Sequence, residues 1–366
     1  MLMLKSIDLY IIKEFIKSLL VVIAIMFSII LLITLLDELS FYRTNKDLKF
    51  THLILFILLK IPNALFNLFP FLVLFSGIIF FLKIYNYNEI ISLRIMGYSN
   101  IKILLIPALT SFVIGYLILL LLVPLSSSLL KYYEELKSNF DEKRNVVFVN
   151  ETGIWIIDRT EKEKNIIRIE KIDKDFSIIN LITIYIYDHN NNFIKRIEAN
   201  DGNIIYNEWQ LNKVNIISSN NKVVKENILN TYTYKSNIKI NELRNIYKNV
   251  ETTSLVDINK EILILEDKGY STLDLRIRFQ KLISFPLYLL SMSILSGILI
   301  INLGKTSNYI KYGIYGVILS VIIYFLNDLS ITMAKSEIIS VDFSVWIPIF
   351  LITLINLVGI TQVNAR

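Results

Sequence analysis

The chain contains no cysteine. This absence excludes disulfide bonds, thiolate metal sites and a lipidated N-terminal cysteine. Histidine is scarce as well, because His52 and His189 are the two in the sequence and they fall in different segments. We therefore expect no metal site, and any domain outside the membrane must be held together by its own hydrophobic core.

Common catalytic motifs are also missing. The sequence has no His-Glu-x-x-His and no Gly-x-Ser-x-Gly. Gly304-Lys305-Thr306 resembles the end of a phosphate-binding loop, but Leu299 stands where that loop needs its first glycine. We predict a non-catalytic chain without a cofactor of its own, so that uphill transport would depend on ATP bound by a partner subunit.

What the chain has instead is long apolar runs. Hydrophobic residues make up 54% of the sequence and the mean hydropathy is +0.54, which is typical of a membrane protein. A membrane-spanning helix needs about 20 mostly apolar residues. Six runs meet this requirement: Ser18–Leu36, Ile61–Leu82, Ile103–Leu130, Leu282–Leu303, Tyr312–Ala334 and Phe343–Ala365.

The six runs predict a 3+3 arrangement with three parts. Residues 1–130 would form the first three spans, 131–272 a polar domain, and 273–366 the last three spans. If the N-terminus is cytoplasmic, the inner segments carry nine Lys and Arg residues and the short outer loops carry five. The positive-inside rule then predicts cytoplasmic termini and a polar domain on the outer side.

The polar domain alternates apolar and polar residues with period two, as in Ile182–Tyr187 and Thr231–Tyr234. Turn-forming residues interrupt these runs at Asn190–Asn192, Asp201-Gly202 and Asn220-Asn221. The pattern predicts an antiparallel, jelly-roll-like all-β domain, followed by a helix over Leu255–Lys268. Such a domain could be a rigid cap, could pair its strand edges with another β-protein, or could hold an acyl chain.

A short amphipathic helix is predicted at about 88–97, between the second and third spans. Glu89 lies in its first turn, where the helix dipole favours an anion, and Gly97 ends it. Helices that lie on lipid are usually rich in Lys and Arg, whereas this helix carries Arg94 alone. We therefore favour a helix that fits a protein groove, the form of a coupling helix in an ABC transporter permease; its docking residues would be Glu89, Ile90, Leu93, Arg94, Met96 and Gly97.

The chain resembles the lipopolysaccharide-export permeases of the LptF/LptG family over essentially its whole length. The matching pieces occur in the expected order and are Asp8-Leu9-Tyr10-Ile11, Leu36-Asp37-Glu38-Leu39, Phe69-Pro70, Asn88-Glu89 to Gly97, Val123-Pro124, Gly153-Ile154-Trp155, Trp209-Gln210-Leu211 and Pro286. Asp37-Glu38 and Leu326-Asn327-Asp328 are more similar to the LptG branch than to the LptF branch.

The resemblance implies a permease subunit in the bacterial inner membrane, with the β-domain in the periplasm. Its partners would be a cytoplasmic ABC ATPase dimer, a second homologous permease, and a membrane-anchored jelly-roll bridge protein that receives lipopolysaccharide; nucleic acid is not expected. The alternative is a membrane-anchored periplasmic assembly or receptor protein without transport activity. Copurification with an ATPase would separate the two.

A lipopolysaccharide site needs cations near the outer headgroups and an apolar chamber at acyl depth. The candidate cations are Arg43, Lys46, Lys131 and Lys137, with snorkelling from helix ends as the alternative role. The candidate chamber residues are Phe66, Phe69, Phe71 and Phe75, with plain helix packing as the alternative. Asp37 and Asp328 are acidic residues in or beside the membrane, and we expect Asp328 to face protein or water, where Lys60 or Lys335 could pair with it.

Overall fold

A computed structural model describes residues 6–44, 48–138, 140, 146–150, 153–159, 163–172, 178–188, 192–205, 208–220, 223–236, 250–267, 272–303 and 309–364. The chain divides into two compact units. The membrane unit contains Met1–Tyr133 and Arg276–Arg366, and the β-unit contains Glu134–Leu275. Lys46, His189, Gly269 and the Gly304–Thr306 tripeptide lie outside the described residues.

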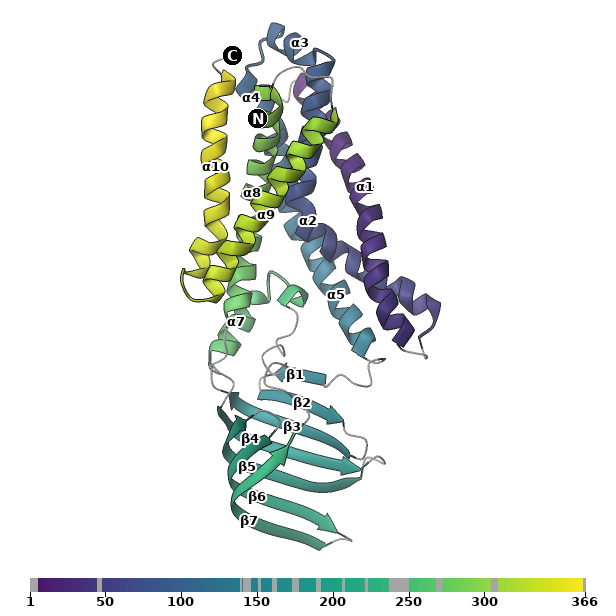
Figure 1. Ribbon diagram of the computed structural model, residues 1–366, viewed down its shortest axis with the longest axis vertical. Helices are drawn as coiled ribbons and strands as arrows, with labels where there is room; N and C mark the ends of the chain where they lie inside the picture. Colours follow the sequence, from purple (N-terminus) through teal and green to yellow (C-terminus); the bar gives the residue numbers. More distant parts are fainter. Residues whose placement is uncertain are drawn as a thin grey trace. The chain divides into compact units, whose positions relative to one another are not determined.

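The six predicted spans are confirmed, because six described helices are long and apolar enough to cross a membrane. They are α1 (Ser6–Thr44), α2 (Phe50–Asn86), α4 (Asn100–Leu117) continued through a π-helical turn η1 (Ile118–Leu122) into α5 (Val123–Ser138), α8 (Leu273–Leu303), α9 (Tyr309–Lys335) and α10 (Val341–Asn364) (Figure 1). The short helix α3 (Glu89–Ile95) connects α2 to α4.

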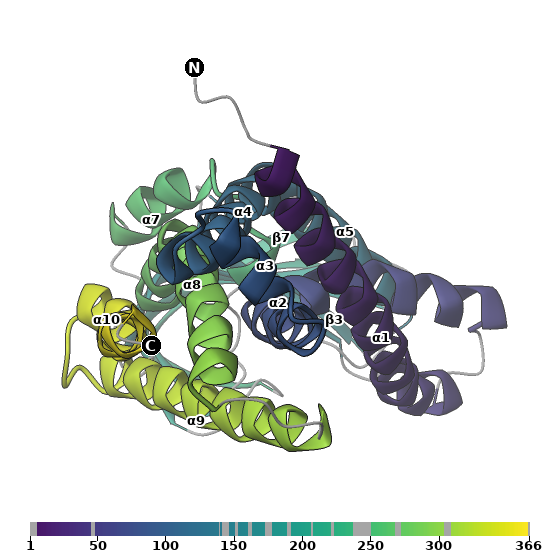
Figure 2. The same ribbon diagram turned by 90° about the horizontal axis from the view of Figure 1, so that it is seen from above.

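Helix α8 is central to the membrane unit. Seen end-on in Figure 2, it lies between α10 on one side and α2 on the other. Small residues of α8 permit close packing against its neighbours. A Cβ atom on Gly297 would lie 2.2 Å from Leu104 Cδ2 of α4 and 2.7 Å from Phe81 Cε2 of α2. Close approach through small residues is the usual way in which membrane helices associate.

The β-unit contains one antiparallel sheet whose seven described strands pair in chain order. The sheet is open and is in line with the predicted jelly-roll-like fold. Its strands are β1 (Val146–Asn150), β2 (Gly153–Arg159), β3 (Glu163–Ile172), β4 (Ile178–Asp188), β5 (Phe193–Ile205), β6 (Glu208–Asn220) and β7 (Val223–Lys235).

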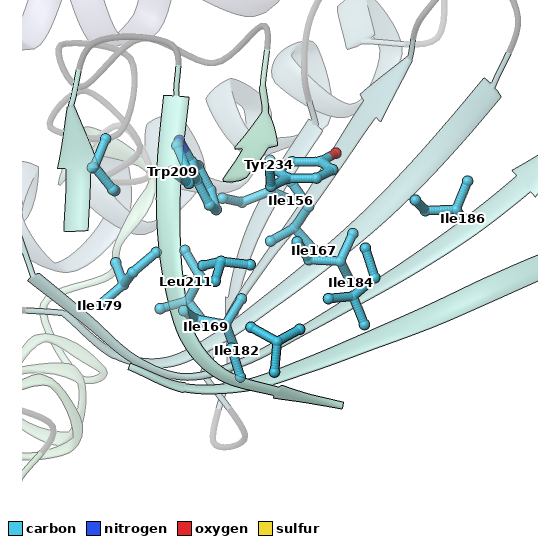
Figure 3. Packing of buried hydrophobic residues seen from close by; sticks show 14 of the residues in the cluster. Ile156, Ile167, Ile169, Ile179, Ile182, Ile184, Ile186, Trp209, Leu211 and Tyr234 are labelled. Atoms are coloured by element: carbon cyan, nitrogen blue, oxygen red, sulfur yellow. The ribbon is translucent and has the colours of Figure 1, made fainter. Parts of the chain in front are cut away.

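One face of the sheet carries the hydrophobic core of the β-unit (Figure 3). The alternating isoleucines of β4, Ile182, Ile184 and Ile186, are buried there as predicted, together with Trp209 of β6. The expected helix is present as α7 (Ile258–Asp267), after a 3-10 turn η2 (Val250–Thr252), and its Leu265 packs into the same core.

The prediction of a turn at Asp201-Gly202 is wrong, because both residues lie inside β5. The sheet bends there instead. In the neighbouring strands Leu181 and Lys213 have left-handed φ angles of 53° and 50°, and buried residues on either side of them are separated by three positions instead of two. The pairing register continues unchanged through these positions, so the three strands change their facing residues together and both halves of each strand face the same core. Gly202 fits the bend because a Cβ atom there would lie 2.7 Å from Leu211 Cδ2.

Candidate functional site

The predicted coupling helix is α3. It lies at the end of the membrane unit where α1 begins and α10 ends (Figure 1). Asn88 occupies its N-cap position with a left-handed φ of 58° and without a capping hydrogen bond from its side chain. Gly97, with φ of 87°, follows the C-cap residue Met96, so the glycine ends the helix as expected.

The apolar residues of α3 divide into a buried pair and an exposed face. Ile90 and Leu93 are each 5% exposed, whereas Met96 is 61% exposed and therefore does not continue their stripe. The reason is local, because the helix has already ended at Ile95 and the chain turns at Gly97. Met96 instead joins Ile91 and Ile95, the latter 82% exposed, in what we call the α3 apolar face.

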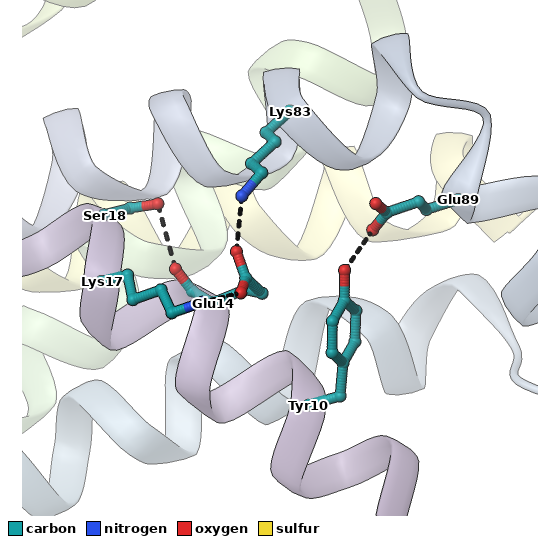
Figure 4. Close-up of polar contacts among 6 residues, drawn as sticks. All are labelled: Tyr10, Glu14, Lys17, Ser18, Lys83 and Glu89. Atoms are coloured by element: carbon teal, nitrogen blue, oxygen red, sulfur yellow. Dashed lines mark hydrogen bonds and ion pairs between the residues drawn. The ribbon is translucent and has the colours of Figure 1, made fainter.

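A pocket of about 430 Å³ lies between α3 and the first turns of α1. Its lining residues are Ser6, Ile7, Tyr10, Glu89, Ser92, Leu93 and Met96. The Tyr10 hydroxyl donates a hydrogen bond of 3.0 Å to Glu89 Oε2 (Figure 4). Tyr10 was not among the candidate site residues, although it belongs to the Asp8–Ile11 segment that carried part of the family resemblance.

Glu14 ties α1 to α2 one turn further along (Figure 4). Its side chain is 8% exposed, and its Oε2 lies 2.6 Å from Lys83 Nζ in the last turn of α2. Lys17 pairs with the other carboxylate oxygen. A carboxylate that is buried to this extent needs such cationic partners, because an unpaired charge is costly away from water.

The segment that joins α3 to α4 is also held against α1, by a second set of contacts. The Tyr98 hydroxyl donates a hydrogen bond of 2.8 Å to Asp8 Oδ1. Burial, and then the hydrogen bond to Asp8, raise the pKa of Tyr98, so its phenol stays protonated and continues to donate. Lys102 Nζ lies 3.7 Å from the same Asp8 oxygen and 4.2 Å from the centre of the Tyr98 ring.

Asn100 links the loop to the last span. Its Nδ2 donates to the carbonyl oxygen of Val363 in α10 at 2.9 Å, and its Oδ1 accepts from Arg94 Nε at 2.8 Å. The segment from α3 to the start of α4 is thus attached to both α1 and α10.

A buried acid lies at the opposite end of α1, and it is Glu38, the residue after the predicted boundary acid Asp37. Glu38 is 1% exposed and its Oε1 accepts from Lys60 Nζ at 2.9 Å and from the Tyr133 hydroxyl at 2.7 Å. Asp37 is exposed. Glu38 continues the buried face of α1, because Ile30, Thr34 and Glu38 follow at helical four-residue spacing and all three are buried.

The pairing of Lys60 with Glu38 corrects the expected contact between Lys60 and Asp328. Lys60 belongs to α2 and lies 22 residues from Glu38 in sequence, across the turn that joins α1 to α2. Asp328 is exposed on α9.

Comparison with known protein families identifies the chain. The family model of the lipopolysaccharide export system permeases LptF/LptG matches residues 9–362. The chain belongs to this family. No individual curated protein matches it. Membership supports a role in lipopolysaccharide export as a multi-pass permease of the inner membrane, a transporter component and not a catalytic enzyme. The match does not separate the LptF branch from the LptG branch, so the LptG assignment stays a prediction.

The candidate lipid residues of this LptF/LptG permease are placed as follows. Arg43 is exposed in the last turn of α1, Lys131 is exposed in the membrane unit, and Lys137 is half-buried in the β-unit. Their contact with a headgroup stays a prediction.

The four candidate chamber phenylalanines, all in α2, lie against other helices or are buried. Phe66 stacks on Phe285 of α8 with ring centres 4.8 Å apart, and Phe71 lies 6.5 Å from the ring of Tyr324 in α9. Phe69 is buried, and Phe75 is close to α9, because a Cβ atom on Gly316 would lie 3.2 Å from its ring. These contacts favour packing within the chain, and the acyl chamber stays a prediction.

Proposed function

We propose that this permease is the membrane component of an ABC exporter whose cytoplasmic ATPase docks on α3. The observation that carries the proposal is the α3 apolar face beside the pocket that contains Glu89. ATP hydrolysis in the partner would move α3, and the attached spans would then expel lipopolysaccharide toward the periplasmic side.

The properties of α3 support protein contact more than lipid contact. The helix carries one acid and one basic residue, Glu89 and Arg94, whereas helices that lie on anionic lipid carry several cations. Apolar side chains as exposed as Ile95 and Met96 mark interaction surfaces when they gather beside a pocket with a charged group. A cytoplasmic ATPase that meets this surface needs an apolar groove and a group complementary to a carboxylate.

The β-unit would receive the lipid and pass it to a periplasmic bridge of similar fold. Its strand order leaves β1 and β7 as the edges of the described sheet. Strand β7 carries the exposed apolar residues Ile228 and Leu229. An exposed strand edge is able to pair with a strand of another β-domain. We propose accordingly that the termini are cytoplasmic and that a second homologous permease completes the complex.

Copurification tests the proposal. We expect the tagged permease, extracted in mild detergent, to retain an ATPase, a second permease and lipopolysaccharide. Ile95→Ser removes part of the α3 apolar face and should lower recovery of the ATPase. Ile338→Ser is the control, because Ile338 is equally an exposed isoleucine but lies in the loop between α9 and α10.

Glu89→Ala should lower ATPase recovery or the amount of lipopolysaccharide released per ATP hydrolysed. Normal recovery together with normal ATP-dependent release in this variant would contradict the role of α3. Failure of the unaltered protein to retain any ATPase would instead favour the alternative of an assembly or receptor protein without transport.

A further inference from the structure

The first turns of α1 contact the segment from Glu89 to Asn100, which we call the coupling loop, at two separate points. Tyr10 bonds to Glu89 at the start of α3, and Asp8 accepts from Tyr98 just after α3 ends. The partners are 79 and 90 residues apart in sequence. One contact would leave α3 able to rotate about it, whereas two contacts on either side of a seven-residue helix fix its orientation relative to α1.

We propose that this segment of α1, Asp8–Lys17, is a positioning element of the coupling apparatus, in which Tyr10 orients the Glu89 carboxylate and Asp8 holds Tyr98. The inference rests on the proposed docking of an ATPase on α3. It adds that α3 does not act alone, because its orientation and its charged group are both set by the first span.

The Tyr10–Glu89 contact suits this role. Glutamate has several rotatable bonds, so an unrestrained Glu89 would lose rotamer freedom each time a partner engages it. The Tyr10 hydroxyl, 3.0 Å from Oε2, restrains the carboxylate before docking. The phenol contributes a hydrogen bond to a charged acceptor, which is stronger than a bond between neutral groups.

The same segment of α1 leads into the membrane. Helix α1 continues without a break from Ser6 to Thr44, and the buried Glu14 joins it to Lys83 of α2 at 2.6 Å. Ile11 and Phe15, on the inner face of these turns, are fully buried. A displacement of α3 is therefore passed to a rigid helix that is anchored in the core of the membrane unit.

Three substitutions separate positioning from docking. The permease is purified with its own ATPase, placed in lipid nanodiscs with lipopolysaccharide, and assayed for ATP hydrolysis and lipid release. We expect Tyr10→Phe to keep full ATPase recovery while lipid released per ATP falls about tenfold, the equivalent of about 1.4 kcal/mol. Asp8→Asn should act in the same direction, because it removes the charge shared by Tyr98 and Lys102.

Tyr116→Phe is the matched control. Tyr116 is an exposed tyrosine of α4 whose ring contact with Phe112 is retained by phenylalanine. We expect this variant to release as much lipid per ATP as the unaltered protein.

A double variant tests whether Tyr10 acts through Glu89. If it does, Tyr10→Phe combined with Glu89→Gln should be no worse than Glu89→Gln alone. Additive losses of lipid release in the double variant would overturn the inference. It would also be overturned if Tyr10→Phe released less lipid only because less folded complex was recovered. Normal release in both Tyr10→Phe and Asp8→Asn, with Glu89→Gln impaired, would overturn this inference and leave the proposed function standing. A fully active Glu89→Gln would instead contradict the proposed function itself.

Discussion

The buried ion pair between Glu38 and Lys60 makes an asymmetric prediction about stability. Both residues take part in the same contact, yet the protein encloses them to different degrees, because the Lys60 side chain is 30% exposed and that of Glu38 is 1% exposed. Lys60→Met should therefore destabilise the membrane unit more than Glu38→Gln does. Each substitution keeps a side chain of similar length and removes one charge.

The magnitudes follow from what each variant leaves behind. Removing one partner of a buried ion pair costs about 3–5 kcal/mol. Lys60→Met leaves a carboxylate that water does not reach, and we expect about 3 kcal/mol because the Tyr133 hydroxyl, 2.7 Å away, still donates to it. Glu38→Gln leaves a lysine that is only partly enclosed by the protein and an amide oxygen that still accepts from Tyr133, so we expect about 1 kcal/mol. The difference of about 2 kcal/mol is roughly thirtyfold in the unfolding equilibrium.

The assay is unfolding of the purified permease in mixed micelles of mild detergent and dodecyl sulfate, followed by the helical signal in circular dichroism. Asp37→Asn is the control, because Asp37 precedes Glu38 on the same helix but is exposed, and its effect should stay within about 0.5 kcal/mol. Equal destabilisation by Lys60→Met and Glu38→Gln, or a larger effect of Glu38→Gln, would refute the argument from unequal exposure.

Three further predictions concern the core, the helix packing and the orientation. Ile184→Ala, in the fully buried centre of the β-unit, should lower its stability by about 3 kcal/mol, measured by urea unfolding. Gly77→Val should abolish recovery of monodisperse protein in size-exclusion chromatography, because a Cβ atom there would lie 1.9 Å from a serine hydroxyl of α8, whereas Gly313→Val meets nothing within 4 Å and should be tolerated. In this cysteine-free chain, a membrane-impermeant maleimide should label Ile228→Cys from the periplasm and spare Ile95→Cys; the reverse pattern would contradict the proposed topology.

The sequence predicted the elements whose signals are local. Long apolar runs specify spans because an unpaired backbone in lipid is costly, and all six were found. Period-two alternation specified β4 and β7 because one face of the sheet is buried. The prediction of turns from turn-forming residues failed at Asp201-Gly202, where the dipeptide lies at a bend inside β5. Composition alone does not distinguish the two, because the bend also involves the neighbouring strands, where Leu181 and Lys213 have left-handed φ angles.

Contacts between distant segments were harder to predict, and α1 shows why. The sequence showed Glu89 as a candidate because its own helix is amphipathic, but nothing local in the chain points from Glu89 to Tyr10. The burial of Glu38, next to the predicted boundary acid Asp37, was not predicted for a similar reason. Asp37 and Glu38 are adjacent and chemically alike, and the face of α1 that meets α2 decides between them.

The two ends of α1 nevertheless share a rule that sequence reading could apply. Glu14 pairs with Lys83 near one end of the antiparallel helices α1 and α2, and Glu38 pairs with Lys60 near the other. The acids are 24 residues apart on α1 and the lysines 23 apart on α2, so both pairs fit one register of a single helical hairpin. Opposite charges at matching distances from the connecting turn therefore predict the register and rotation of two consecutive spans. In this permease that rotation buries Ile11 and Phe15 and brings Asp8 and Tyr10 to the coupling loop.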